Sequence, residues 1–149
     1  KMICLSVAFA RICQHLDFKM TRTYTEEIFE LTCPYDNQYQ GIRSRYLFVC
    51  SAGMLRSPTG AAVATKLGYN ARSCGSAEYA LIPISVNLVH WAHKIFFVEE
   101  RNYLEALDIF TRDIETQNMI ITRATVLEID DVYEYMHPTL VNTFEDILK

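Results

Sequence analysis

The pattern of hydrophobic and polar positions changes its period along the chain, and each period predicts an element. Near the start, Leu5, Phe9, Ile12 and Leu16 recur at the spacing of one helix face. This spacing predicts an amphipathic helix over roughly residues 3–17.

A second, short helix is predicted to start at Thr25. The Thr25 hydroxyl is a suitable cap ahead of Glu26 and Glu27, and Ile28 and Leu31 form the apolar face. The stretch that follows, "CPYDNQYQG" over 33–41, has the composition of a loop.

From residue 46 onward, short apolar runs alternate with helical patterns. The run "YLFVC" at 46–50 is uninterrupted, as expected for a strand covered on both faces. Strands that alternate with helices pair in parallel, so we predict a three-layer α/β sandwich around a four-stranded parallel sheet. The predicted order is strand 46–50, an Ala-rich helix from Ser57 that stops at Gly68, strand 71–74, helix 85–93, strand 94–99, helix 101–112, strand 125–129 and helix 138–149.

The pattern divides the chain into a helical N-terminal extension with a loop, residues 1–44, and an α/β domain, residues 45–149.

Half of the 149 residues are hydrophobic and the net charge is -4, which gives no electrostatic reason to expect nucleic acid. The apolar stretches are short or broken by polar residues, so no membrane span is expected. The five cysteines form no CxxC pair and no metal-ligand spacing, which favours a metal-free protein in the reducing cytoplasm.

The chemistry centres on Cys50, at the carboxyl end of the first strand, where reactive sites of such sheets lie. Gly53 tolerates a positive φ, and this allows the backbone amides that follow Cys50 to turn inward into an anion-binding nest. Arg56 and Ser57 then open a helix whose N-terminus adds positive potential. A phosphate is the anion that fits best, because Arg56 can donate to two of its oxygens. The predicted phosphate-binding residues are Ser51, Ala52, Gly53, Met54, Leu55 and Ser57.

A thiol beside such a nest differs from a core cysteine. Positive potential favours the thiolate, so the pKa of Cys50 is expected to fall well below its free value of ~8.5. Ser57 can also donate a hydrogen bond to the sulfur. Cys50 is therefore predicted to be a nucleophile aimed at phosphorus.

These residues resemble the low-molecular-weight protein tyrosine phosphatase family, in particular its small bacterial and phage relatives. The resemblance covers about residues 46–149 and depends on "FVCSAGMLRSPTG", "WAHKIFFVEE" and "LEIDDVYEYMHPTL". It implies the four-stranded phosphotyrosine phosphatase I-like fold and a phosphocysteine mechanism without a cofactor. By resemblance, Cys50 is the nucleophile, Arg56 clamps the phosphate and Ser57 stabilises the thiolate.

The resemblance also implies a general-acid aspartate on a late loop. Asp131 matches that position better than Asp130, although the usual Asp-Pro-Tyr is absent. Aromatic residues often line the site in this family, and Tyr133 is the first candidate here, ahead of Tyr79 and Tyr135.

The chain departs from the family in its loop. Ala52-Gly53 replaces the usual Gly-Asn, so a supporting amide side chain is missing, and Leu55 replaces a second cysteine found in many relatives. If a disulfide protects the nucleophile, its partner comes from elsewhere, with Cys74 and Cys33 as candidates.

The function predicted from these residues is hydrolysis of phosphotyrosine or other aryl phosphate monoesters, with a phosphorylated protein or a small phosphate ester as partner. The alternative is a phosphate-binding module without turnover on the same fold. Arsenate reduction is disfavoured because no cysteine follows Cys74, and a phosphocysteine carrier has no need of Arg56 or Asp131. The natural substrate and a homodimeric state are left open.

Overall fold

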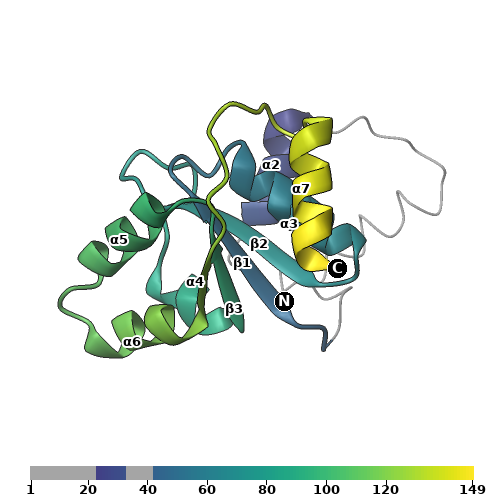
Figure 1. Ribbon diagram of the computed structural model, residues 1–149. Helices are drawn as coiled ribbons and strands as arrows, with labels where there is room; N and C mark the ends of the chain where they lie inside the picture. The colour runs from purple at the N-terminus through teal and green to yellow at the C-terminus, as the bar shows by residue number, and fades with distance from the viewer. Residues whose placement is uncertain (1–22, 33–41) are drawn as a thin grey trace, which may run out of the picture.

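The computed structural model describes residues 23–32 and 42–149 of the 149-residue chain (Figure 1). The helix predicted over roughly 3–17 and the loop predicted over 33–41 lie outside these residues. The division into an extension and an α/β domain stays a prediction.

The four-stranded parallel sheet predicted from the sequence is confirmed. All neighbouring strands pair in parallel, in the order β2-β1-β3-β4. The strands are β1 Arg45–Cys50, β2 Asn70–Gly75, β3 Lys94–Phe97 and β4 Ala124–Val126.

Strand β1 lies inside the sheet and is covered on both faces, which explains its unbroken apolar sequence. Alternate side chains enter two separate cores. Leu47 and Val49 belong to the core on one face, and Phe48 and Cys50 belong to the core on the other. Cys50 is thus the last residue of a strand whose final four residues are buried.

Helices cover both faces of the sheet and complete the three layers (Figure 1). Residues of α3 and α7 pack in the core that contains Cys50, and residues of α4, α5 and α6 pack in the opposite core. The helices are α3 Arg56–Lys66, α4 Val86–Trp91, α5 Glu100–Ile109, α6 Ile114–Arg123 and α7 Pro138–Leu148.

The short helix predicted from Thr25 is present as α2 Tyr24–Thr32, which contacts α3 and β2. Its cap is Thr23 rather than Thr25. The Thr23 hydroxyl accepts from the Glu26 amide at 3.3 Å, while the Glu26 carboxylate accepts from the Thr23 amide at 2.9 Å. This reciprocal pair is a capping box, and it starts the helix earlier than predicted. Ile28 anchors α2 in the interior.

Two predictions between β3 and α7 were wrong. The sequence predicted a single helix over 101–112, whereas α6 forms a further helix that the pattern had not indicated. Its start is set by Asp113, whose carboxylate accepts from the Thr116 amide at 3.1 Å. The strand predicted over 125–129 ends early because Glu128 adopts a φ of 53°, which is incompatible with an extended strand.

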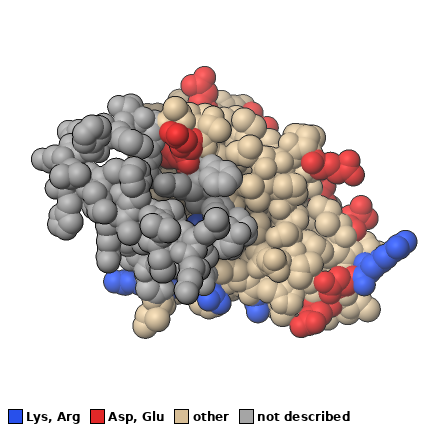
Figure 2. Space-filling model, turned by 180° about the vertical axis from the view of Figure 1, so that it is seen from behind, with Lys and Arg blue, Asp and Glu red and all other residues tan. Residues whose placement is uncertain are grey.

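Figure 2 shows the face opposite to that of Figure 1, where acidic and basic side chains of the described residues are dispersed among uncharged ones. Within the ranges 23–32 and 42–149, no helix has the length and apolar character needed to cross a membrane.

Candidate active site

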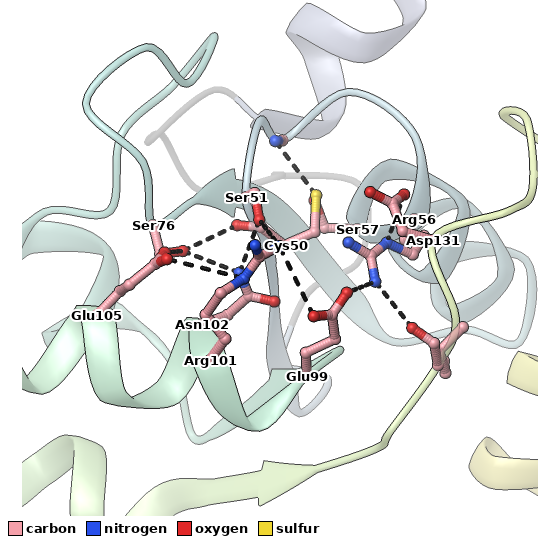
Figure 3. Close-up of polar contacts among 12 residues, drawn as sticks. Cys50, Ser51, Arg56, Ser57, Ser76, Glu99, Arg101, Asn102, Glu105 and Asp131 are labelled. Atoms are coloured by element: carbon pink, nitrogen blue, oxygen red, sulfur yellow. Dashed lines mark hydrogen bonds and ion pairs between the residues drawn. The ribbon is translucent and has the colours of Figure 1, made fainter.

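Cys50 ends β1, and residues 51–55, here called the phosphate-binding loop, connect it to α3. The loop turns back over the sulfur, so that the Gly53 amide donates to Cys50 Sγ at 3.2 Å. The Ser57 hydroxyl lies 2.9 Å from the same sulfur (Figure 3). The sulfur is therefore held by a backbone amide and a hydroxyl, both of which stabilise a sulfur anion.

Ser57 has one hydroxyl proton and two acceptors within reach. Its oxygen lies 3.1 Å from the Cys74 carbonyl, in donating geometry, and 2.9 Å from Cys50 Sγ. With Cys50 as a thiol, the sulfur donates to Ser57 and Ser57 donates to Cys74. With Cys50 as a thiolate, Ser57 turns its proton to the sulfur. The pair can thus follow the charge of Cys50 without a backbone movement.

Four carbonyl groups of the loop, together with that of Cys50, accept hydrogen bonds from donors outside the loop. Across a trans peptide, the C=O and the following N–H point in opposite directions, so an outward carbonyl turns the next amide inward. The Gly53 amide, which points at the sulfur, shows this directly. This arrangement is the one that an anion nest would need, and the nest itself stays a prediction. The outward hydrogen bonds are Ser76 N to Cys50 O at 2.8 Å, Ala77 N to Ser51 O at 3.1 Å, Leu81 N to Ala52 O at 3.0 Å, Tyr24 Oη to Met54 O at 2.6 Å and Thr59 N to Leu55 O at 3.2 Å.

Two glycines make this loop conformation accessible. Gly53 has a φ of 70°, in the left-handed region that glycine adopts at no steric cost. Gly75, at the end of β2, lies so close to the loop that a Cβ atom there would be 2.3 Å from the Ser51 carbonyl oxygen. The loop and the end of β2 can pack together only because residue 75 has no side chain.

Arg56 is the first residue of α3, and its side chain is only 2% exposed. Its Nη1 donates to the Ile129 carbonyl at 2.8 Å and forms a short ion pair with the Glu99 carboxylate. Its Nε lies 3.2 Å from Asp131 Oδ1 (Figure 3). A buried guanidinium needs such partners, and here two carboxylates balance its charge.

Asp131 is thereby brought to the site from the far end of the chain, on the segment 127–137, here called the acid loop. Its side chain is 58% exposed, whereas the arginine that it contacts is buried. Among the described residues, Asp130 makes no ion pair. Of the two neighbouring aspartates, Asp131 is therefore the one that contacts Arg56, and its assignment as the acid stays a prediction.

A second polar cluster supports the phosphate-binding loop from α5. Asn102 Nδ2 donates to the Ser51 and Ser76 hydroxyls, each at 3.0 Å. Arg101 donates to the Ser51 hydroxyl at 3.1 Å, and the Ser76 hydroxyl donates to Glu105 at 2.5 Å (Figure 3). An amide side chain, absent from the loop itself, is therefore supplied by the neighbouring helix.

Sequence reasoning missed Glu99 and Asn102, although one signal was available for Glu99. It comes shortly after β3, and the carboxyl ends of parallel strands meet at one edge of the sheet. Asn102 and Tyr24 carry no comparable signal, because their partners lie far away in the sequence.

The aromatic candidates lie in different surroundings. Tyr133 is half-buried, packs on the core that contains Cys50, and has its ring centroid 5.1 Å from that of His137. Tyr135 packs edge-on against Tyr24 with ring centroids 4.9 Å apart. Tyr79 is 77% exposed, and it projects into solvent rather than packing as a wall.

Cys74 lies on the strand next to Cys50 but faces the other core. Burial, and to a lesser extent the neighbouring Cys50, raises the pKa of Cys74 well above its usual value. Its thiol therefore stays protonated and faces away from Cys50, so Cys74 is a poor disulfide partner for Cys50. Cys33, the other candidate, lies outside the described residues.

A metal site would need several ligands close together. Over 23–32 and 42–149, no cluster of three or more His, Cys, Asp or Glu side chains is arranged to hold a metal ion.

No known family profile matches the sequence, and no curated protein matches it. Solved structures do match. Vibrio vulnificus Wzb in complex with benzylphosphonate aligns at 16% identity over 69% of this chain and 90% of that chain, with a TM-score of 0.50. A protein tyrosine phosphatase from Entamoeba histolytica aligns at 19% identity over 69% and 90%, with a TM-score of 0.48. The YwlE arginine phosphatase from Geobacillus stearothermophilus aligns at 16% identity over 70% and 85%, with a TM-score of 0.49.

The chain has the α/β fold of the low-molecular-weight protein tyrosine phosphatases, which confirms the predicted resemblance at the level of the fold.

Proposed function

We propose that the protein is a cysteine-dependent phosphatase that hydrolyses aryl phosphate monoesters, phosphotyrosine among them, through a phosphocysteine intermediate on Cys50. The observation that carries this proposal is the convergence on one sulfur of an inward amide and a hydroxyl, beside a buried guanidinium. These contacts are not needed to pack a core cysteine. In a nucleophile beneath a phosphoryl group, the amide and the hydroxyl would stabilise the thiolate, and the guanidinium would bind the phosphoryl oxygens.

In the first step, the Cys50 thiolate attacks phosphorus, an S–P bond forms and the bond to the ester oxygen breaks. The loop amides and Arg56 bind the three non-bridging oxygens, whose charge they stabilise in the transition state. Asp131, as a carboxylic acid, gives its proton to the leaving oxygen, so that a neutral phenol departs.

In the second step, the Asp131 carboxylate removes a proton from water, and the water oxygen attacks phosphorus. The S–P bond breaks, inorganic phosphate forms and the thiolate is restored. Because the aspartate enters this step ionised and leaves it protonated, one residue serves both half-reactions.

The Arg56 guanidinium is held in a fixed orientation that would suit binding of the phosphoryl oxygens. Glu99 and the Ile129 carbonyl hold Nη1, which fixes the plane of the guanidinium. The Nε edge faces Asp131. A bound phosphate would compete for this edge, and Asp131 would then be free to approach the leaving oxygen. Because a thiolate nucleophile must stay reduced, we also propose a reducing, cytoplasmic setting.

A phospholigand-binding module without turnover is the second candidate. The ion pair between Asp131 and Arg56 favours it, because an acid kept on the arginine would bind phosphate at the site without protonating a leaving group.

Steady-state hydrolysis of para-nitrophenyl phosphate separates the two. We expect the wild type to be active in the presence of a chelator and to be inhibited by vanadate, and Cys50→Ser to be inactive. Cys74→Ala, which removes the thiol on the opposite face, is the matched control and should keep its activity. Activity of Cys50→Ser equal to wild type would refute the assignment, and phosphate binding without wild-type hydrolysis would support the binding module.

A further inference from the structure

Tyr24 is the residue through which helix α2 contacts both loops of the candidate site. Its hydroxyl donates to the Met54 carbonyl of the phosphate-binding loop at 2.6 Å. Its ring packs edge-on against Tyr135 at 4.9 Å between centroids and 70° between planes. Tyr135 lies on the acid loop, four residues after Asp131. One side chain therefore connects the loop that would bind phosphate with the loop that carries the acid.

The hydrogen bond to Met54 has a consequence for the anion nest. The Met54 carbonyl and the Leu55 amide belong to the same peptide plane and point in opposite directions. By holding the carbonyl outward, Tyr24 keeps the Leu55 amide on the inner side of the loop. The other outward carbonyls each accept from a backbone amide, and those of Cys50 and Leu55 accept from a hydroxyl as well. For Met54, the donor that the structure shows is the Tyr24 hydroxyl on α2.

The ring contact has a consequence for the acid loop. Glu128 and Met136, near its two ends, have φ values of 53° and 59°. Non-glycine residues adopt this conformation only when their surroundings hold them there. The Met136 amide is held by the Thr59 hydroxyl at 3.0 Å, and the Tyr135 ring beside it is held by Tyr24.

Tyr24 also has the protonation state that the contact needs. Burial, and secondly the nearby charge of Cys50, raises the pKa of Tyr24 above its usual value. The phenol therefore stays protonated throughout the pH range in which a cysteine phosphatase works, and it remains a donor to Met54.

We propose that Tyr24, supplied by the helix that precedes the first strand, is a positioning residue for the reaction. It orients the Leu55 amide toward the phosphoryl oxygens and holds the acid loop in its position beside the phosphate-binding loop. The role of Tyr24 in positioning the acid loop rests on the proposed phosphatase function, whereas its role in orienting the Leu55 amide can be tested by phosphate binding alone.

Two substitutions separate the two contacts. Tyr24→Phe keeps the ring and removes the hydroxyl, and Tyr24→Leu removes both. Tyr69→Phe is the matched control, because Tyr69 stacks on Tyr46 at the amino end of β2, away from Cys50.

Two measurements report on the two contacts. Calorimetry measures the affinity for inorganic phosphate and requires no catalytic turnover. The ratio of kcat/KM for phenyl phosphate to that for para-nitrophenyl phosphate reports on acid assistance, since phenol is the poorer leaving group.

We expect Tyr24→Phe to bind phosphate about three- to ten-fold more weakly than the wild type, the loss of one hydrogen bond, with an unchanged leaving-group ratio. Tyr24→Leu should weaken phosphate binding similarly and also lower the ratio several-fold. Tyr69→Phe should change neither quantity. A merely structural role would lower the thermal unfolding midpoint and leave the leaving-group ratio unchanged.

Phosphate affinity equal to the wild type in Tyr24→Phe would overturn the positioning of the Leu55 amide. An unchanged leaving-group ratio in Tyr24→Leu would overturn the role in the acid loop. If the wild type binds phosphate but hydrolyses neither ester, the phosphatase proposal fails, while a loss of affinity in Tyr24→Phe would still support the role of Tyr24 in the nest.

Discussion

The phosphate-binding loop and the acid loop lie on either side of the same arginine, yet they are built in opposite ways. The first is short, follows a buried strand and has its carbonyls fixed by specific donors, with glycine at its one described position of positive φ. The second is longer and mostly exposed, and its positive-φ positions are Glu128 and Met136. The first loop has the fixed backbone that a bound anion would require. The second is joined to the end of β3 by backbone hydrogen bonds from Leu127 and Ile129, and beyond Ile129 it is held by side-chain contacts.

This difference fits the two tasks. A transition-state cradle works best when its dipoles need no reorganisation during the reaction. An acid that serves a leaving group and then a water molecule has to adjust its position between the two steps. Asp131 is exposed, whereas Arg56 is buried, and this exposure would give the proposed acid such freedom.

The strongest test of the cradle is Arg56→Lys. Lysine keeps the positive charge, but its ammonium group cannot make the bidentate hydrogen bonds of a guanidinium and keep the contacts with Glu99 and Ile129 as well. We therefore expect kcat/KM for para-nitrophenyl phosphate to fall about 10³-fold. Stopped assays at several substrate concentrations measure it. A loss below ten-fold would show that charge alone is enough and that the oriented guanidinium is not required.

The acid loop is tested by Asp131→Asn beside Asp130→Asn. Removing the proton donor should lower kcat/KM for phenyl phosphate about 10²-fold, with a smaller loss for para-nitrophenyl phosphate because its leaving group needs less assistance. Asp130→Asn, which changes the same charge one residue away, should behave like the wild type. The reverse ranking of the two variants would move the acid to Asp130.

The rigidity of the phosphate-binding loop is tested by Gly75→Ala. A methyl group there meets the Ser51 carbonyl oxygen, so the loop has to move away from β2. We expect a loss of about 2–3 kcal/mol in the free energy of unfolding, measured with urea, together with weaker phosphate binding. Gly68→Ala is the contrasting variant: Gly68 has a φ of 96° and open space around it, so its substitution reports backbone strain without a steric clash.

The smallest effect is expected for Glu128→Gly on the acid loop. Glycine relieves the cost of the left-handed conformation but adds freedom to the unfolded chain, so we expect a net stabilisation of about 1 kcal/mol or less. Urea denaturation at neutral pH measures it. Destabilisation comparable to that of Gly75→Ala would show that Glu128 makes contacts that its backbone conformation does not reveal.

Much of the fold was predictable because its pattern is local. The apolar run of β1, the Ala-rich α3 and the terminal α7 appear in the structure close to their predicted bounds. Helix α6 was missed since its partly buried face gives a weak pattern, and its Asp113 cap went unnoticed. Strand β4 was predicted too long because no sequence pattern announces the positive φ of Glu128.

By itself, the sequence determined the relation of Cys50, Gly53, Arg56 and Ser57. These residues lie within one strand end, one turn and the start of one helix, where the backbone permits few arrangements. Only the tertiary structure decided that Glu99, Asn102, Asp131 and Tyr24 join them. Their contacts connect residues about 30 to 75 positions apart in the chain. Such contacts form only when the sheet and its covering helices bring separate loops to one edge of the sheet. No local hydrophobic pattern in the sequence predicts them.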